Sequence, residues 1–176
     1  MFRSCARALL LFLSCAQLAG CSPALDWREF KLPESQLLLL VPCKPGAQQR
    51  WVPLAGQPVR LTLYVCSAGG QSWSLAVADL TDPARIALAL AGLLASATDN
   101  IGGAPSRPAP FLVHGATPNP GSLRSRLQGK LPDGRLVHMQ VAVFTHGTHV
   151  FQATVLGEAV ALEAAEVFFD GLRVVP

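Results

Sequence analysis

The sequence predicts an α+β fold, in which an antiparallel β-sheet made of two meanders carries two main helices. Apolar runs of strand length, separated by short turns, occupy residues 27–80 and again residues 123–156. Each region is followed by a stretch in which apolar residues recur at helical spacing, within residues 84–97 and 158–171. Because strands and helices are segregated in this way, we expect a sandwich of one sheet and two helices.

Turn residues divide the first region into predicted strands. These strands span residues 27–32, 36–41, 49–54, 59–66 and 72–80. The continuous apolar run at 36–41, which Pro42 ends, is typical of a strand buried on both faces. Pro53 cannot donate a hydrogen bond to a neighbouring strand, so the third strand is expected at a sheet edge.

The first helix is predicted to begin at Asp82, a residue suited to cap a helix N-terminus, with Pro83 in the first turn. The apolar residues of its helical pattern are Ile86, Leu90, Leu93, Leu94 and Ala97. The segment 104–121 is rich in proline and predicts a long irregular crossover to the second half of the chain.

The second region repeats the pattern of strands followed by a helix. Its predicted strands span residues 123–131, 137–143 and 150–156. A Pro-Asp-Gly turn at residues 132–134 joins the first two of them as a hairpin. The closing helix at 158–171 is amphipathic, and its inner stripe comprises Leu162, Ala165, Phe169 and Leu172.

The N-terminal segment differs from the rest of the chain. Arg3 and Arg7 give it a short basic end, and an apolar run of about nine residues follows from Ala8. This run is far shorter than the roughly 20 residues that a membrane-spanning helix needs, so it is typical of a secretion signal. The segment closes with LAGC at residues 18–21, which resembles the lipobox of bacterial lipoproteins at all four positions. The alternative is an ordinary signal peptide whose cysteine is coincidental.

The resemblance to lipoproteins implies a specific maturation. The thiol of Cys21 would be alkylated with diacylglycerol, the Gly20–Cys21 bond would be cut, and the new amino group would be acylated. The protein would then be held in a lipid bilayer by its acyl chains. Ser22 stands where an aspartate would favour the inner membrane, so the resemblance implies an outer-membrane anchor with the domain facing the periplasm.

Cleavage would divide the chain into a signal peptide at 1–20, a short lipidated linker at 21–25 and a single domain at 26–176. Loss of the two signal-peptide arginines lowers the net charge from +3 to +1. We expect no nucleic-acid partner, because such proteins need clustered Lys and Arg and a strong basic balance. The sequence also contains no linear catalytic, cofactor or metal motif, so we expect no enzymatic activity, no cofactor and no metal.

Two cysteines lie outside the N-terminal segment. Cys43 and Cys66 remain if Cys5 and Cys15 leave with the signal peptide and Cys21 carries lipid. In an oxidising compartment an even pair of cysteines is a candidate disulfide. The alternative is two separate buried thiols, because free cysteine is among the most buried side chains.

Two surfaces are candidates for binding a partner. The first consists of three basic residues on one face of a predicted strand, Arg124, Arg126 and Lys130. This face would suit anionic lipid or polymer, or would be a solvated outer sheet face. The second is the outer side of the helix at 84–97, which includes Leu88 and Ala91. That side is either covered by the proline-rich crossover or exposed as a patch that receives a partner.

His146 and His149 stand three positions apart across a predicted turn. Metal sites in proteins usually need three or four ligands, and no Cys or acidic residue lies close by in the sequence. A polar hairpin tip explains these histidines without a metal.

The order of elements is similar to that of the PsbP-like superfamily and its small bacterial lipoprotein relatives of the DcrB type. The similarity is strongest from GKLPDGRLVHMQVAVFTHGTHVFQATVLG to ALEAAEVFFDGLRVV, and it spans most of residues 26–175. It implies a PsbP-like sandwich and a non-catalytic binding, accessory or assembly role with an envelope protein as partner. The alternative is a small envelope hydrolase or ligand-carrying protein whose site is assembled from residues distant in the sequence.

Overall fold

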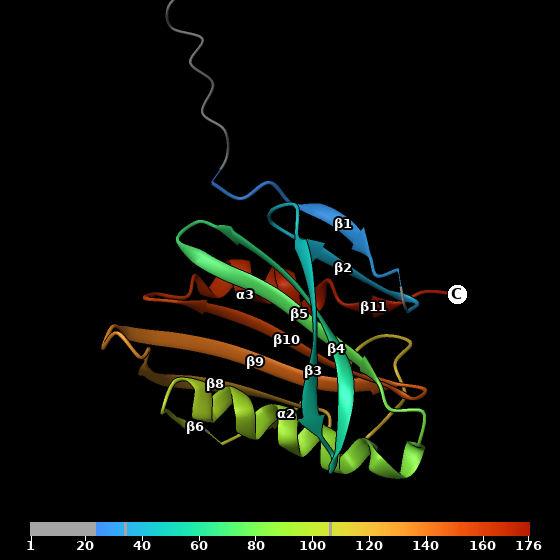
Figure 1. Ribbon diagram of the computed structural model, residues 1–176. Helices are drawn as coiled ribbons and strands as arrows, with labels where there is room; N and C mark the ends of the chain where they lie inside the picture. Colours follow the sequence, from blue (N-terminus) through green and yellow to red (C-terminus); the bar gives the residue numbers. More distant parts are fainter. Residues whose placement is uncertain (1–23, 34, 106) are drawn as a thin grey trace, which may run out of the picture.

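The structure is a computed structural model that describes residues 24–33, 35–105 and 107–176 (Figure 1). Two antiparallel sheets dominate it. The smaller sheet contains, in order, β1 (Arg28–Lys31), β2 (Leu37–Val41) and β11 (Arg173–Val174). The larger, eight-stranded sheet contains, in order, β3 (Gly46–Leu54), β4 (Gln57–Ala68), β5 (Gln71–Asp79), β10 (His149–Gly157), β9 (Leu136–His146), β8 (Leu123–Lys130) and β6 (Ala104–Pro105), and β7 (Ala109–Pro110) also pairs with β8.

Two α-helices accompany the sheets in the described part of the chain. They are α2 (Ile86–Asn100) and α3 (Leu162–Asp170). A single 3₁₀ turn, η2 (Pro83–Arg85), precedes α2 and begins where the sequence predicts. The Asp82 carboxylate caps this turn by accepting a hydrogen bond of 3.0 Å from the backbone N–H of Ala84.

The prediction of an α+β fold with a PsbP-like sandwich of one sheet and two main helices is wrong. The described part of the chain instead forms a mainly β structure, a β-sandwich of two antiparallel sheets with two short helices of 15 and 9 residues. The first two strands do not join the meander that follows them, because β1 pairs with β2 and β2 pairs with β11. The pairing of Leu38 with Arg173 joins the two ends of the domain, and such long-range pairing leaves no local pattern in the sequence.

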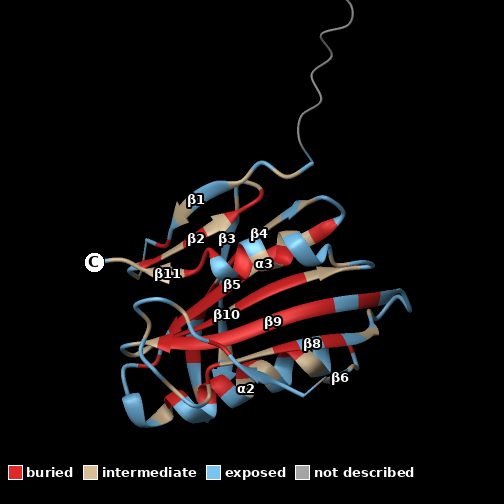
Figure 2. Cartoon of the chain, turned by 180° about the vertical axis from the view of Figure 1, so that it is seen from behind, coloured by how far each residue is buried: buried red, intermediate tan, exposed pale blue. Residues whose placement is uncertain are grey.

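The larger sheet separates two packed layers (Figure 2). One of its faces packs against α3 and the smaller sheet, and the other packs against α2. Alternate residues of β5 show this division, since Trp73 and Leu75 face the first layer while Ala76 and Ala78 face the second. Strands β9 and β10 lie in the middle of the sheet and are buried along most of their length.

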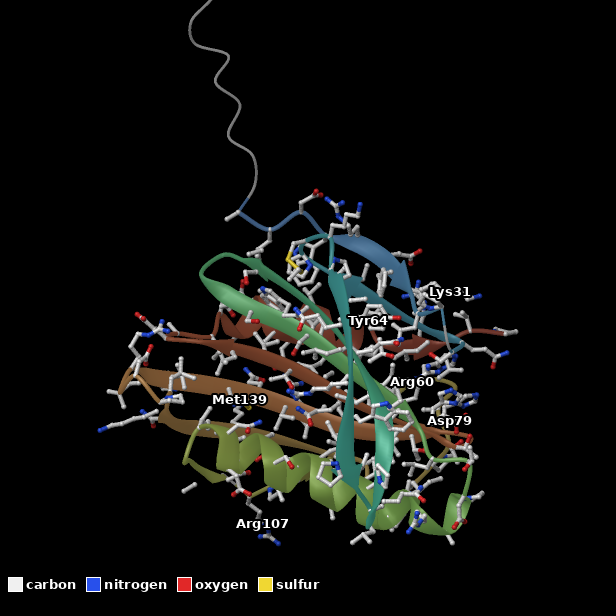
Figure 3. The ribbon with its side chains drawn as sticks, in the orientation of Figure 1. Lys31, Arg60, Tyr64, Asp79, Arg107 and Met139 are labelled. Atoms are coloured by element: carbon white, nitrogen blue, oxygen red, sulfur yellow. A yellow bond between two sulfur atoms is a disulfide. The ribbon has the colours of Figure 1, made fainter. Side chains whose placement is uncertain are left out.

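A disulfide between Cys43 and Cys66 confirms the predicted bridge and rules out two separate thiols. It joins the segment after β2 to β4, and therefore links the smaller sheet to the larger one. The bridge lies at the end of the molecule where the described chain begins (Figure 3). Trp27 packs there edge-on against Trp73 with ring centroids 5.6 Å apart, so Leu25 and Trp27 tie the start of the described chain to the core.

The crossover at 104–121 is largely irregular, as expected, but it contributes the short strands β6 and β7 to the edge of β8. No helix in the described part of the chain is long and apolar enough to span a membrane.

Candidate functional site

The main structural candidate for a binding site is a gap between two neighbouring strands. The ladder between β4 and β5 runs from Ala68 paired with Gln71 to Thr62 paired with Val77, and ends there. Both strands continue past this point, β4 back to Gln57 and β5 on to Asp79. Beyond the ladder, β4 keeps its pairing with β3, and β5 keeps its pairing with β10. The strands therefore diverge and open a cleft of about 650 Å³, which we call the β4–β5 cleft.

The cause of the divergence is the packing of the β3–β4 hairpin on α2. Leu54 and Leu61 of the hairpin share a core cluster with Leu90 of α2. At Gly92 of α2, an added Cβ would lie only 3.5 Å from a methyl carbon of Leu54, so the hairpin tip sits closely on the helix. The hairpin tip therefore follows the helix, while β5 stays with β10 in the sheet.

Side chains from several strands form one row along this cleft. Trp51 of β3 pairs with Arg60 of β4, and Asp79 of β5 pairs with His149 of β10. Cross-strand partners lie on the same face of a sheet, and all four residues line the cleft. Trp51 is 71% exposed, although large apolar side chains are usually buried. Figure 3 labels Arg60 and Asp79, which lie on the right of the view, away from the first described residues at the upper left.

The floor of the cleft is mainly apolar. Its buried residues are Val59, Val77, Ala78 and Leu80, and Thr62 is the buried polar residue beside them. Val59, Ala78 and Leu80 belong to the cluster that packs on α2. The cleft therefore combines an apolar base with a polar and aromatic rim, which is the usual composition of a ligand site, and its volume lies in the usual range of such sites.

The two charged residues of the rim differ in their partners. A hydrogen bond from the Thr148 hydroxyl, together with the Thr81 backbone N–H and the neighbouring His149, holds the pKa of Asp79 below its ordinary value. The Thr81 N–H lies 3.0 Å from the Asp79 carboxylate. Arg60 makes no ion pair within the described residues. Among the described residues, the cleft therefore presents a cation that makes no ion pair beside an exposed indole.

Arg124, predicted as part of a basic binding stripe, instead holds α3 on the sheet. Its guanidinium donates to both carboxylate oxygens of Glu166 at 2.8 Å and to the side-chain oxygen of Gln140 at 2.6 Å. It also lies 4.0 Å from the centre of the Phe169 ring, as a cation–π contact does. Arg126 is exposed and 3.6 Å from Glu166, so this carboxylate partly neutralises the stripe. Lys130 is exposed at the end of β8.

The contact between Arg124 and Glu166 predicts a pH effect on stability. The hydrogen bond from Arg124 lowers the pKa of Glu166 in the folded protein, against the opposing effect of partial burial. A carboxyl with a lowered folded-state pKa stabilises the fold above its unfolded pKa, and this contribution is lost as the pH falls through the folded pKa. The Glu166→Gln variant should therefore lose less stability than the wild type between about pH 5 and pH 3.

Urea unfolding at a series of pH values measures this difference. Glu163→Gln is the control, because Glu163 is exposed on the same helix and has no ion pair within the described residues. If Glu166→Gln and Glu163→Gln gave identical pH profiles, the contact would not contribute in solution.

The outer side of α2 is exposed. Leu88 is 61% exposed and Ala91 is also exposed, so the alternative in which the crossover covers this side is wrong. Leu88→Asp is expected to change the free energy of unfolding by no more than about 0.5 kcal/mol, as for other surface substitutions. Leu90→Asp, at a position only 1% exposed, should unfold at a much lower urea concentration. A comparable loss of stability in both variants would show that Leu88 is covered.

His146 and His149 face each other across the turn between β9 and β10. No group of three or more His, Cys, Asp or Glu side chains in the described part of the chain is arranged to hold a metal ion. The pairing of His149 with Asp79 places it on the rim of the β4–β5 cleft instead.

Comparison with known proteins adds no assignment to this geometry: no protein-family model matches the chain, and no curated protein matches it. The predicted lipidation and cleavage residues, Cys21 and Gly20, lie outside the described residues. The predicted candidates Leu88 and Arg124 do not line the β4–β5 cleft.

The sequence did not predict that the residues of the β4–β5 cleft form a binding site. One signal for it was present, because Pro58 interrupts the hydrogen-bonding capacity of a strand that is otherwise rich in β-forming residues. Trp51, an aromatic residue two positions before the edge-strand Pro53, was a second signal. The proximity of Arg60 to Asp79 depends on how β4 and β5 pair, and no spacing in the sequence encodes it.

Proposed function

We propose that this protein is a non-catalytic binding module of the cell envelope, anchored in the outer membrane through an acylated Cys21 and facing the periplasm. Its binding site for an envelope protein partner is the β4–β5 cleft. The anchor is supported by the likeness of residues 18–21 to a lipobox and by Ser22 after it. The binding role is supported by two residues on the rim of the cleft: the exposed Trp51, and Arg60, which makes no ion pair within the described residues.

The position of the cleft relative to the anchor carries this proposal. Leu25 and Trp27 already pack against the core, so only about three residues separate them from Cys21. Three extended residues reach about 10 Å, and an acylated Cys21 would hold that end of the domain against the bilayer. Arg60 and Asp79 lie away from that end, on the opposite side of the molecule in the view of Figure 3. An anchored domain would thus present the cleft to the periplasm.

The rim chemistry supports binding over catalysis. A general acid or base works best when its pKa is close to the working pH. The Thr148 hydroxyl lowers the pKa of Asp79 instead, and the carboxylate accepts a hydrogen bond from Thr81. Asp79 therefore fixes the turn after β5 and remains a carboxylate at neutral pH.

Site-specific photocrosslinking in the envelope tests this role. A photoreactive phenylalanine at Trp51 should yield one discrete adduct with an envelope protein, and Arg60→Glu in the same chain should abolish it. The control is the same probe at Leu136, which is 58% exposed and does not line the cleft. Absence of an adduct at position 51, or equal adducts at both positions, would contradict the proposal.

A further inference from the structure

We propose that the β4–β5 cleft binds an extended peptide segment of its partner by β-strand addition, with a peptide carboxylate directed to Arg60. This inference rests on the proposed function, in which the cleft is the binding site for a partner. It adds which chemical features the bound segment should have. The pairing register of the two hairpins that share β4 shows which backbone groups face the cleft.

Both hairpins are built on two-residue turns with positive φ at each position. The φ values are 52° and 79° at Ala55 and Gly56, and 59° and 72° at Gly69 and Gly70. In such hairpins the residues that flank the turn form a hydrogen-bonded pair. Hydrogen-bonded and non-hydrogen-bonded pairs then alternate along the ladder. The turn positions therefore fix the direction in which each backbone group of β4 and β5 points.

Counting from the first turn, Arg60 and Trp51 form a non-hydrogen-bonded pair. The backbone N–H and C=O of Arg60 therefore point away from β3 and toward β5. Counting from the second turn, Thr62 and Val77 form a hydrogen-bonded pair, and the next such pair would be Arg60 with Asp79. The ladder ends before that pair forms.

The backbone groups of Arg60 and Asp79 consequently face each other across an open gap. Within the described residues, no hydrogen bond to the backbone of either residue crosses this gap. Unpaired N–H and C=O groups on a strand edge are a template for pairing with another extended chain. Here Arg60 on β4 and Asp79 on β5 face the same gap, so one inserted segment could pair with both residues.

The side chains around the gap define which segment fits. Successive residues of an inserted strand point to opposite faces of the sheet. On one face the side chains of the inserted strand would meet the rim, where Trp51 offers an aromatic surface and Arg60 offers a cation that makes no ion pair within the described residues. On the other face they would meet Val59 and Ala78, which pack on α2. The favoured ligand therefore alternates an acidic residue with small apolar residues.

A carboxylate is the expected partner of Arg60, because guanidinium groups form charge-assisted hydrogen bonds with carboxylates. The nearest acid in the row, Asp79, is already occupied by Thr148 and Thr81. An acidic side chain of the ligand, or its C-terminal carboxylate, would supply the missing counter-charge.

Peptide selection against the full chain in detergent micelles tests the inference. The probe is a library of random ten-residue peptides. We expect enriched sequences to carry Asp or Glu beside small apolar residues. Binding should slow hydrogen exchange at the amides of Arg60 and Asp79. N-methylation of alternate peptide nitrogens should weaken binding at least tenfold, because it removes the donors that strand addition requires.

Matched variants assign the carboxylate contact. Arg60→Gln should weaken the selected peptides at least tenfold, whereas Arg50→Gln should leave their affinity unchanged. Arg50 is exposed on the neighbouring strand, and its position next to Trp51 places it on the opposite face of the sheet. Both variants should unfold in urea at the wild-type midpoint, since both side chains are exposed.

Three results would overturn the inference: no enriched peptide, equal binding of the N-methylated peptides, or displacement of the peptides by acetate at equal molar concentration. The last result would indicate a site for small carboxylates. If any of these results were found while the photoreactive residue at position 51 still gave a discrete adduct in the envelope, only binding by strand addition would be contradicted. The proposed binding function would still be supported.

Discussion

Replacing Trp73 with alanine is expected to lower the free energy of unfolding by about 4 kcal/mol, the usual cost of removing a large aromatic side chain from a core. Trp73 is 1% exposed and contacts Trp27 and Phe168 edge-on, with ring centroids 5.6 and 5.5 Å away. Its indole N–H also donates to the Ala68 carbonyl at 3.1 Å. This one side chain thus joins the first described segment, the larger sheet and α3.

Urea unfolding of the purified protein measures this effect. Trp73→Phe is the matched control, because it keeps an aromatic ring but loses the hydrogen bond to Ala68, and it should cost clearly less. If Trp73→Ala cost less than about 1 kcal/mol, this side chain would not fill the core in solution.

Removal of the disulfide, with Cys43→Ser and Cys66→Ser together, should lower the free energy of unfolding by about 3 kcal/mol. The bridge closes a sequence separation of 23 residues and links the smaller sheet to β4. Without it, the unfolded chain gains conformational freedom and the two sheets are held together by packing alone.

Reduction of the wild-type protein provides an independent measurement of the same effect. Reduced wild type and the double serine variant should unfold at similar urea concentrations, both below that of the oxidised protein. A double variant as stable as the oxidised wild type would contradict the structural role of the bridge.

Local patterns predicted many of the elements. The apolar run before Pro42 forms the buried strand β2, because a strand covered on both faces needs no polar alternation. Asp82 caps the turn before α2 because its carboxylate satisfies a backbone N–H that lacks a helical partner. Such features depend on residues close together in the sequence, so a linear reading can detect them.

The fold class and the cleft depend on contacts between distant residues. The pairing of β2 with β11 makes a second sheet from segments at the two ends of the domain. Arg124 was predicted to lie on a binding face, but Glu166, 42 positions away, holds it against α3. The β4–β5 cleft exists because the tip of the β3–β4 hairpin packs on α2, where β4 no longer pairs with β5. Each of these contacts requires the tertiary structure.

The intact mass of the mature protein, extracted from membranes of a Gram-negative host that expresses the full chain, tests the proposed anchor most directly. If the protein is anchored as proposed, the mature polypeptide begins at Cys21 and carries a diacylglyceryl group and an amide-linked acyl chain. Cys21→Ser should remove these lipids and release the protein from the membrane fraction. A mature chain that begins at another residue, or that has no acyl groups while it remains in the membrane fraction, would contradict the account.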